Sequence, residues 1–361
     1  MPEETVAKFE VKKVSILDED GRADEKIMPK LSDKQIKDFY EWMVLTRVYD
    51  DKAVKLQRQG RIGTYPSMLG QEATIIGSGL AFDKKDWIFP SFRETSIYFI
   101  RGVEMSQLFQ AWGGDGRGLS LPRSANMFPI AIPVGTQTLH AVGAAMAAKL
   151  KGDKIAVATF FGDGATSEGD VTEALNFAGV YKSPVVFINQ NNQWAISVPR
   201  KRQTAAETLA QKAIAAGFEG IQVDGNDVFA VYKVVKYALE KARKGNGPTF
   251  IECVTYRMNN HTTSDDALKY RDEKEVKLWE KRDPIDRLVK YMKKKKIFTE
   301  DYRKKVLEKA MKMVEDAVAK YESMPPQKIE DIFAFTYEKL TPDLEEQKQD
   351  LLDSEKGEGE K

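Results

Sequence analysis

A βαβ unit over residues 155–194 constrains the fold more than any other stretch of this sequence. Residues 155–161 form an apolar run rich in β-branched and aromatic side chains, typical of a strand covered on both faces of a parallel sheet. Apolar residues then recur at helical spacing from Val171 to Ala178, and Gly179 is expected to end this helix. A second apolar strand follows at 185–189. A right-handed crossover makes two such strands parallel, which predicts a doubly wound, mostly parallel α/β sheet.

Polar residues follow both strands of this unit. Asp163 stands in a Gly-Asp-Gly turn after the first strand, and Asn191 and Asn192 follow the second. Since the carboxyl ends of parallel strands open on one edge, about 4.8 Å apart when adjacent, these groups can converge on one cation. A carboxylate, an amide oxygen and a backbone carbonyl suit Mg²⁺, which fills its remaining positions with water and phosphate. The helix after the turn offers its N-terminus to a phosphate.

Composition narrows the class of protein. A hydrophobic fraction of 42% in 361 residues is ample for a core, and a net charge of +1 gives no argument for a nucleic-acid or anionic-membrane partner. Cys253 is alone, so no intrachain disulfide can form, which suits a reducing cytosol. The sequence has no signal-like start and no apolar stretch long enough to span a membrane. We therefore expect a cytoplasmic protein.

Four segments are expected along the chain. Residues 1–31 form an arm with a short strand at 11–16, and residues 32–282 form the α/β domain. Residues 283–340 form a helical extension, and the acidic tail 341–361 is expected to be disordered. Further helices are predicted at 33–59 (capped by Ser32), 72–80, 139–150, 205–216 and 228–244, and further strands at 220–224 and 249–256.

Three polar residues outside the βαβ unit have to be assigned a functional or a structural role. Arg93 can clamp a phosphate bidentately, although an ion pair with Glu94 explains the same pattern. His261 follows the last strand on a polar loop at the same sheet edge, where an imidazole can carry protons near pH 7; an ordinary loop histidine is the alternative. His140 lies in a helix rich in Ala and Gly and is assigned a structural role.

These motifs occur together in one protein family. The 26 residues between Gly164 and Asn191 are similar to the spacing of the thiamine-diphosphate motif. The chain resembles the alpha subunit of thiamine-diphosphate-dependent 2-oxoacid dehydrogenases, the decarboxylating component of the pyruvate and branched-chain complexes, over roughly Leu31 to Ile332. The resemblance rests on residues 69–73, 92–93, 135–137, 162–164 with 191–192, 223–227 and 256–266.

The resemblance implies that thiamine diphosphate is bound through Mg²⁺. The metal ligands would be Asp163, Asn192 and the main-chain carbonyl of Trp194. His261 would also assist acyl transfer to a lipoyl group, and its loop would be mobile until the cofactor binds. Some relatives bind K⁺ around residues 135–137, which makes that loop a candidate K⁺ site. The implied cofactor-binding residues are Phe92, Arg93, Gly164, Ala165 and His261 at the diphosphate, Ile132 and Val134 beside the rings, and Asp163, Asn192, Trp194 and Ala195.

The resemblance also implies partners and a substrate class. A beta subunit would supply the carboxylate that activates the cofactor, giving an α₂β₂ heterotetramer, and a lipoyl-bearing acyltransferase core would take the acyl group. Mammalian pyruvate-type enzymes carry a histidine where this chain has residues 65–68, whereas the branched-chain type lacks it and has a loop similar to residues 261–266. This favours branched-chain 2-oxo acids, with pyruvate next. Thr262 replaces the kinase-regulated serine of animal enzymes, so phosphoregulation is not implied.

Three other functions stay open. An acetoin dehydrogenase alpha subunit belongs to the same family and differs in substrate. A Mg²⁺-dependent phosphoryl-transfer enzyme would use Asp163, but no Asp-x-Asp-Gly-Thr pattern is present and the Asn-Asn pair would have no role. A non-catalytic subunit with a relic cofactor fold would not need to keep the Mg²⁺ ligands, Arg93 and His261, all of which are present.

Overall fold

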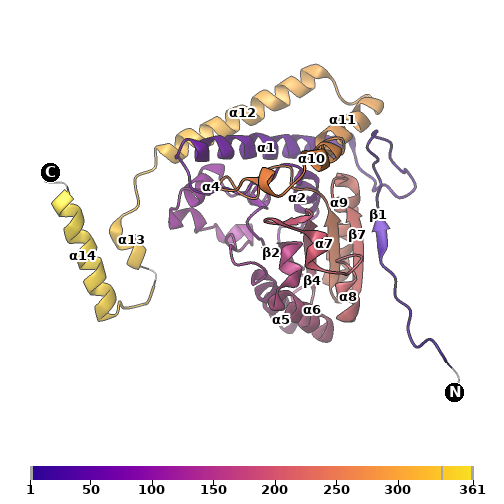
Figure 1. The fold of residues 1–361 in the computed structure, drawn as a ribbon, viewed down its shortest axis with the longest axis horizontal. Coiled ribbons are helices and arrows are strands. Elements are labelled where there is room, and N and C mark those ends of the chain that lie inside the picture. Colours follow the sequence, from indigo (N-terminus) through magenta and orange to yellow (C-terminus); the bar gives the residue numbers. More distant parts are fainter. Residues whose placement is uncertain (1–2, 335, 359–361) are drawn as a thin grey trace. The chain divides into compact units, whose positions relative to one another are not determined.

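The computed structural model describes residues 3–334 and 336–358, and the chain divides into two compact units, Met1–Val318 and Ala319–Lys361. Figure 1 shows the course of the chain through its helices and strands. The strands are β1 (Lys12–Val14), β2 (Trp87–Phe89), β3 (Val157–Gly162), β4 (Val185–Asn191), β5 (Trp194–Ala195), β6 (Val198–Pro199), β7 (Glu219–Asp224) and β8 (Thr249–Val254). The helices of the first unit are α1 (Asp33–Arg58), α2 (Glu72–Gly79), α3 (Thr95–Ile100), α4 (Met105–Trp112), α5 (Gln137–Lys151), α6 (Gly169–Tyr181), α7 (Arg200–Gln203), α8 (Lys212–Ala215), α9 (Val228–Arg243), α10 (Glu273–Glu280), α11 (Pro284–Lys294) and most of α12 (Glu300–Glu322).

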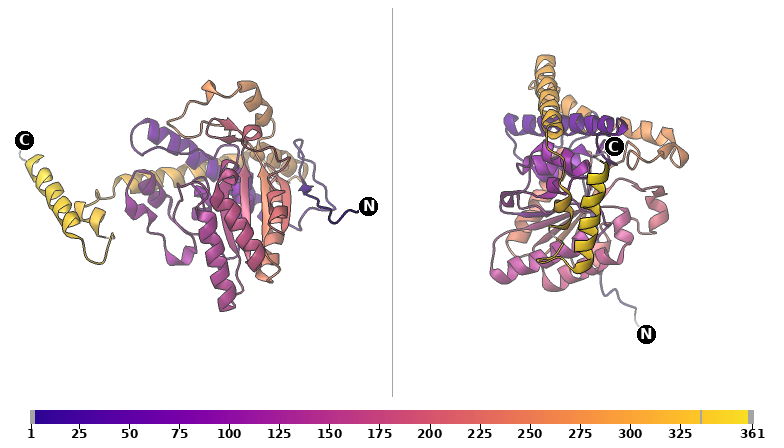
Figure 2. Two further views of the ribbon diagram at one scale, coloured as in Figure 1. Left: turned by 60° about the horizontal axis from the view of Figure 1, so that its bottom comes forward. Right: turned by 90° about the vertical axis from the view of Figure 1, so that its left-hand side faces the viewer.

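One parallel sheet organises the first unit. Its strand order is β1-β7-β8-β4-β3-β2, and each neighbouring pair runs parallel. β3 and β4 are adjacent, with Gly162 opposite Gln190, as the βαβ unit predicts. Helices cover both faces (Figure 2): α5 and α6 pack together on one side, and α2 and α9 pack together on the other. The fold class predicted from the sequence, a doubly wound α/β sheet, is confirmed.

The helix ends show where local signals decide the structure. Ser32 caps α1 with a capping box that includes Gln35, as predicted. The prediction that Gly179 ends α6 is wrong, because the helix continues to Tyr181 and Lys182 takes the left-handed conformation. Gly179 is instead needed for close packing, since a Cβ there would overlap the carbonyl oxygen of Ala216.

The helix predicted at 205–216 is also largely wrong. Only the single turn α8 forms in it, and residues 204–208 have no helical structure. The backbone N–H groups of Leu209 and Ala210 donate to the carboxylate of Glu252, at 2.9 and 3.1 Å. A buried tertiary acceptor therefore competes with helix formation in this segment and outweighs its Ala-rich composition.

The N-terminal arm completes one edge of the sheet. β1 pairs with β7 in parallel, and the backbone N–H groups of Ile16 and Leu17 donate to Asp227 at 2.5 and 2.6 Å. Asp227 also caps α9 through its other carboxylate oxygen, which accepts from the first turn of that helix. The arm is therefore bound to the body of the first unit through residue 17.

The segments after residue 282 are mainly helical. α11 packs against α1 and α2, and Arg47 forms ion pairs of 2.8 Å with both Glu72 and Asp283. The first compact unit includes these helices up to Val318, and the division into an α/β domain 32–282 and a helical extension 283–340 stays a prediction. In the second unit, α13 (Ile329–Phe333) packs against α14 (Pro342–Glu358). The predicted disorder of 341–361 is wrong for residues 342–358, where Pro342, Asp343 and Glu345 in the first turn favour a helix start; residues 359–361 lie outside the described residues.

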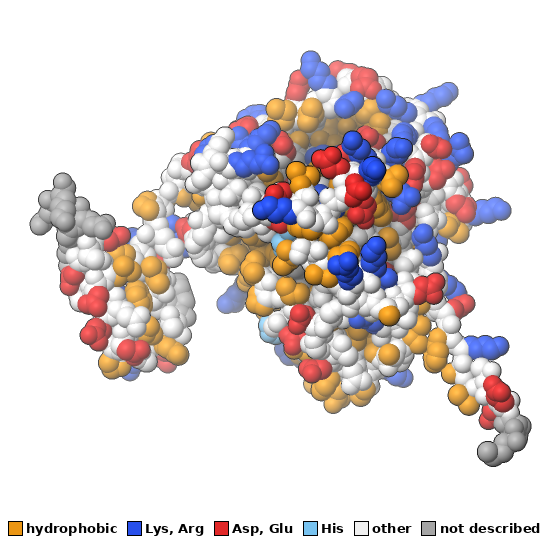
Figure 3. All heavy atoms as spheres, viewed as in Figure 1, with side chains coloured by type: hydrophobic (Ala, Val, Ile, Leu, Met, Phe, Trp, Pro, Cys, Tyr) orange, Lys and Arg blue, Asp and Glu red, His pale blue; other side chains and the backbone are white. Residues whose placement is uncertain are grey.

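Surface charge is mixed on the face of the first unit shown in Figure 3. Lys and Arg side chains are interspersed there with Asp and Glu side chains, with apolar groups between them. Within residues 3–334 and 336–358, every helix is too short or too polar to cross a bilayer.

Candidate functional site

The carboxyl edge of the sheet gathers the polar side chains that the sequence places after its strands. β3 ends at Gly162, directly before Asp163, and β4 ends at Asn191, directly before Asn192. β8 ends at Val254, and the chain then crosses this edge, where the Arg257 N–H donates to the Asn192 carbonyl at 3.2 Å. Three strand ends therefore deliver a carboxylate, an amide and a guanidinium to one place.

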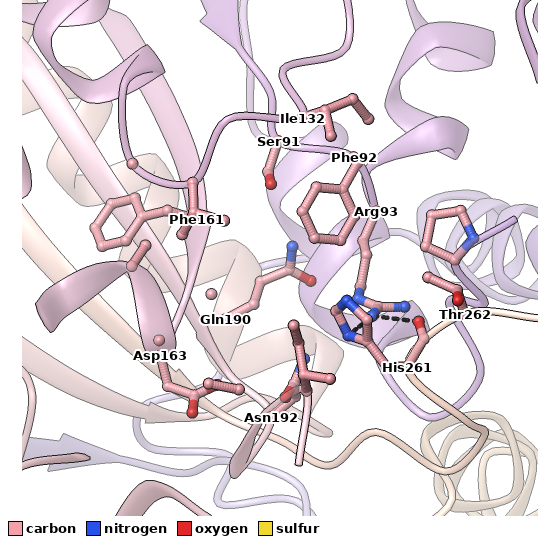
Figure 4. Close-up of a pocket in the computed structure, with 18 of the residues that line it drawn as sticks. Ser91, Phe92, Arg93, Ile132, Phe161, Asp163, Gln190, Asn192, His261 and Thr262 are labelled. Carbon is pink, nitrogen blue, oxygen red and sulfur yellow. Dashed lines mark hydrogen bonds between the residues drawn. The ribbon is translucent and has the colours of Figure 1, made fainter. Parts of the chain in front are cut away.

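A cavity of about 520 Å³ opens at this edge. Figure 4 shows Asp163 on one side of it, Arg93 and His261 together on the other, and Gln190 between them. All eleven residues that the sequence analysis proposed for the site lie in its wall: Phe92, Arg93, Ile132, Val134, Asp163, Gly164, Ala165, Asn192, Trp194, Ala195 and His261.

The acidic side of the cavity has the donor set that Mg²⁺ requires. Asp163 is only 2% exposed, and burial raises its pKa to about 6, although a hydrogen bond from Gln203 at 2.8 Å opposes that shift. Asn192 and Trp194 line the same wall, and the Trp194 carbonyl accepts from Arg257 Nη1 at 3.3 Å. Among the described residues, no group of three His, Cys, Asp or Glu side chains could hold a metal. One carboxylate with amide and carbonyl oxygens is a donor set that suits Mg²⁺ with its water and phosphate ligands.

The Gly-Asp-Gly turn packs closely against Ala195 of β5. A Cβ on Gly164 would lie 2.6 Å from the Cβ of Ala195, so a larger residue cannot be accommodated without movement. The turn continues as a 3₁₀ segment, Gly164–Ser167, before α6 begins at Gly169. The helix whose N-terminus was predicted to receive a phosphate is therefore separated from the Gly-Asp-Gly turn by this 3₁₀ segment.

On the basic side of the cavity, His261 lies beside two buried arginines, of which Arg93 lines the cavity. Arg93 donates through Nη2 to the carbonyl oxygen of His261 at 2.7 Å, and the same Nη2 lies 2.9 Å from His261 Nδ1. Nη1 of Arg257 lies 3.4 Å from the same Nδ1. The hydrogen bonds of Arg93 go to neutral acceptors, whereas Glu94 bonds to Ser91 and Gln190, so Arg93 and Glu94 do not form the alternative surface ion pair. Arg93 lines the cavity and can therefore meet an anion, whereas Arg257 is fully buried, donates to the carbonyls of Trp194 and Ile196, and adds positive charge beside His261.

Burial and the neighbouring charges together set the protonation state of the histidine. Burial, followed by Arg93 and Arg257, lowers the pKa of His261 to about 3. The imidazole is therefore neutral near pH 7 and can accept a proton or a hydrogen bond. His261 is held in a loop in which Asp265 accepts from its backbone N–H at 2.8 Å and Arg271 donates to the carbonyls of Met258 and Asn259. The expected mobility of this loop before cofactor binding stays a prediction.

Several residues of the site carried no sequence signal strong enough to select them. Arg257 is fully buried and follows the last strand. It lies within residues 256–266, which contribute to the family resemblance, but no role was predicted for it. Gln203 reaches Asp163 from α7, which no sequence spacing indicates. His140 is exposed on α5 and is not in the cavity wall.

Three glutamines of the wall each have a buried side-chain atom with no hydrogen-bond partner among the described residues: Gln71 Nε2, Gln137 Oε1 and Gln190 Oε1.

Comparison with known proteins identifies relatives that match most of the chain. A family model described as "Dehydrogenase E1 component" matches residues 40–330. A 3-methyl-2-oxobutanoate dehydrogenase subunit alpha of Mycobacterium tuberculosis is 44% identical over 322 residues, covering 89% of this chain and 88% of that protein. A pyruvate dehydrogenase E1 component subunit alpha of Staphylococcus aureus is 40% identical over 346 residues, covering 95% of this chain and 93% of that protein.

Proposed function

The chain belongs to the dehydrogenase E1 component family as an alpha subunit of the 2-oxoacid dehydrogenases, and we propose that its substrates are branched-chain 2-oxo acids. The reaction of this family is a thiamine-diphosphate-dependent decarboxylation. The observation that carries the proposal is the cavity itself, with the buried carboxylate of Asp163 on one side and the buried guanidinium of Arg93 beside His261 on the other. That arrangement complements a diphosphate ester with its divalent cation.

Asp163, Asn192 and the Trp194 carbonyl are proposed as the Mg²⁺ ligands. Asp163 would supply the only negative charge of this set, and Gln203 would fix the orientation of its carboxylate. When bound, thiamine diphosphate supplies the nucleophilic carbon and accepts the electron pair released with carbon dioxide. The residues proposed to contact the diphosphate are Phe92, Arg93, Gly164, Ala165 and His261, those beside the rings are Ile132 and Val134, and Ala195 is a further proposed cofactor contact.

A K⁺ site at residues 135–137 is a further part of the proposal. Gln137 is 3% exposed, and its Nε2 donates to the carbonyl of Phe160 at 2.7 Å. Its Oε1 is buried without a hydrogen-bond partner among the described residues. An uncompensated buried oxygen is costly, and a monovalent cation bound by it would remove that cost.

Alpha subunits of this family pair with a beta subunit, and we propose an α₂β₂ heterotetramer that transfers its acyl group to a lipoyl-bearing acyltransferase. Ile132 and Val134 are 60% and 51% exposed in the cavity wall, so part of the site is open in this chain alone. A partner that covers this apolar rim would exclude water from the reaction and can supply the acid that activates the cofactor.

His261 is proposed to assist the transfer of the acyl group to the lipoyl disulfide, in which one sulfur becomes bonded to the acyl carbon, the S–S bond breaks and the other sulfur leaves as a thiolate that must take up a proton. Its low pKa means that a proton held by the imidazole is given up readily to such a thiolate. The buried arginines beside it explain why the proton would not be kept, since a positive charge on the imidazole is repelled by both. The histidine therefore suits a transient proton carrier.

The substrate preference rests on the cavity wall formed by segment 64–68. Thr64, Pro66 and Trp112 line this side of the cavity. Tyr65 is fully buried, with its hydroxyl bonded to Asp50 and its ring 5.4 Å from that of Trp112. These three wall residues are uncharged and largely apolar, which suits the aliphatic side chain of a branched 2-oxo acid.

The test is an activity assay on the chain co-expressed with its beta subunit. With Mg²⁺ and thiamine diphosphate, decarboxylation is followed with an artificial electron acceptor for branched-chain 2-oxo acids, pyruvate, 2-oxoglutarate and acetoin. The highest kcat/KM is expected for a branched-chain acid; a higher value for pyruvate or acetoin refutes the substrate assignment alone. No turnover of any substrate by an intact complex refutes the proposed function. His261→Ala should reduce lipoyl acylation far more than decarboxylation with the artificial acceptor.

A further inference from the structure

Asp50 is a buried carboxylate beside the cavity that the proposed chemistry does not use. It projects from α1 and is 3% exposed. Its Oδ1 accepts from the Tyr65 hydroxyl at 3.1 Å and from the Met68 N–H at 2.7 Å, and its Oδ2 accepts from the Ser67 hydroxyl at 2.6 Å. All three donors are neutral and lie in one short segment. Burial raises the pKa of Asp50, and these hydrogen bonds oppose that shift.

The segment that Asp50 binds is connected to both elements of the basic site. The carbonyl of Ser67 accepts from Arg93 Nη1 at 2.6 Å, and its hydroxyl oxygen accepts from Asn259 Nδ2 at 2.9 Å. Tyr65 and Thr263 exchange two hydrogen bonds of 3.0 Å, from the Tyr65 N–H to Thr263 Oγ1 and from the Thr263 N–H to the Tyr65 carbonyl. Segment 65–68 therefore spans the distance between α1, Arg93 and the loop that carries His261.

The charge of Asp50 fixes the direction of these hydrogen bonds. A carboxylate only accepts hydrogen bonds, so the Ser67 hydroxyl must donate its hydrogen bond to Asp50. The lone pairs of the hydroxyl oxygen are then free to accept from Asn259. A buried carboxylate without a cationic donor costs free energy, and its three hydrogen bonds confine it to one position. Asp50 on α1 thereby fixes the position of Ser67. It also fixes the Ser67 carbonyl oxygen, which accepts from Arg93.

We propose that Asp50 is a positioning residue of the cofactor cavity, which acts through Ser67 to hold Arg93 and the His261 loop in their binding arrangement. The inference rests on the proposed function, because it assumes that Arg93 and His261 contact the diphosphate. Asp50→Asn preserves the volume of the side chain but replaces one acceptor oxygen by an NH₂ group. That group faces either the Ser67 hydroxyl or the Met68 N–H, both of which now donate to Asp50, so each orientation disturbs a hydrogen bond of segment 65–68.

The experiment uses the full chain assembled with its beta subunit. Two quantities are measured: the Kd of thiamine diphosphate in the presence of Mg²⁺, by calorimetry, and the rate of proteolysis within residues 257–272 before cofactor is added. The variants are Asp50→Asn, Ser67→Ala and the double variant. The matched control is Asp51→Asn, an exposed neighbour on α1 that pairs with Lys55. We expect Asp50→Asn to weaken cofactor binding about tenfold and to speed proteolysis, and Asp51→Asn to change neither.

The double variant separates positioning from a general loss of stability. If Asp50 acts through Ser67, Asp50→Asn should add little to Ser67→Ala, because both break the same path; independent structural damage would add. Additive effects, or unchanged binding in both single variants, overturn the inference. Should Asp50→Asn fail to assemble, unchanged binding in Ser67→Ala overturns it, and weakened binding with faster proteolysis supports it. Failure of the wild type to bind thiamine diphosphate overturns the proposed function and this inference with it, whereas normal wild-type binding with unchanged variants overturns this inference alone.

Discussion

The protonation of His261 can be followed at a single residue in a chain that has only two histidines. Burial, Arg93 and Arg257 together lower its pKa to about 3, against about 6.5 for an unperturbed histidine. Without cofactor, the imidazole should therefore remain neutral from pH 8 down to about pH 5. The perturbation that tests the cause is Arg93→Met, which removes the nearer guanidinium and keeps much of the side-chain volume.

The magnitude follows from the geometry of the pair. Nη2 of Arg93 lies 2.9 Å from Nδ1 of His261. Two unit charges about 4 Å apart interact by about 4 kcal/mol at an effective dielectric constant of about 20, equivalent to about three pKa units. Water that enters the space left by the guanidinium will screen the remaining groups, so we expect Arg93→Met to raise the pKa of His261 by about one to two units. Burial and Arg257 should keep it below 6.5.

The same shift predicts the sign of a change in stability with pH. Between pH 3 and 6.5 the unfolded chain binds one more proton at His261 than the folded chain does, so the free energy of unfolding falls as the pH is lowered. The full slope is about 1.4 kcal/mol per pH unit, and because the unfolded histidine is only about half protonated at pH 6.5, the change between pH 6.5 and 5.5 is on the order of 1 kcal/mol. His261→Gln should lack this contribution.

The assay is an NMR titration of the protein labelled with ¹³C at the histidine ring. His140→Gln removes the second signal and so assigns the first. A His261 signal that titrates with a midpoint above pH 5.5 in the cofactor-free wild type would refute the reasoning. If the midpoint is low but does not move in Arg93→Met, burial alone sets the protonation state and the role given to Arg93 is wrong.

Two further predictions concern the metal ligand and the packing of α6. Asp163→Ala should weaken Mg²⁺-dependent binding of thiamine diphosphate by more than about a hundredfold in calorimetry, since even groups behind a metal ligand typically contribute ten- to a hundredfold; binding within tenfold of wild type would exclude Asp163 as a ligand. Gly179→Ala should lower the free energy of unfolding by about 1–3 kcal/mol, because the new methyl group overlaps a backbone carbonyl. Gly169→Ala, in the same helix but with open space around the added Cβ, is the matched control and should not destabilise; equal effects in denaturant would refute the packing argument.

The sequence predicted the sheet edge well because its signals there are local and repeated. Two apolar runs with a helix between them fix parallel neighbours, so the positions of Asp163 and Asn192 follow from the chain direction alone. Arg93 and His261 reached the same cavity from separate segments, and only the family resemblance brought them together in advance. Their direct contact depends on burial and on loop packing that spacing does not reveal.

The errors arose where tertiary packing outweighed a local rule. Gly179 has the residue type expected at a helix end. It is needed instead because a side chain there would overlap a segment more than 30 residues later in the chain. The Ala-rich composition of 205–216 predicts a helix. Two backbone N–H groups of this stretch instead donate to the carboxylate of Glu252, which lies on β8. Gln203 and Asp50 gave no signal, since glutamine and aspartate on helices are usually solvated and only the fold shows what they face.

The pairing of β1 with β7 has a consequence for the order of folding. The first strand to be synthesised adds to the sheet through residues 221–223, and the hydrogen bonds to Asp227 span 210 and 211 residues. A contact of such sequence separation closes a very long loop, so it forms late, after the intervening strands and helices have shortened the effective path. During synthesis the arm must therefore remain unpaired until residue 227 has emerged. We expect the β7 edge to be the last part of the sheet to be covered, and the stage before that to be the one at which the nascent chain is most exposed to association with other chains.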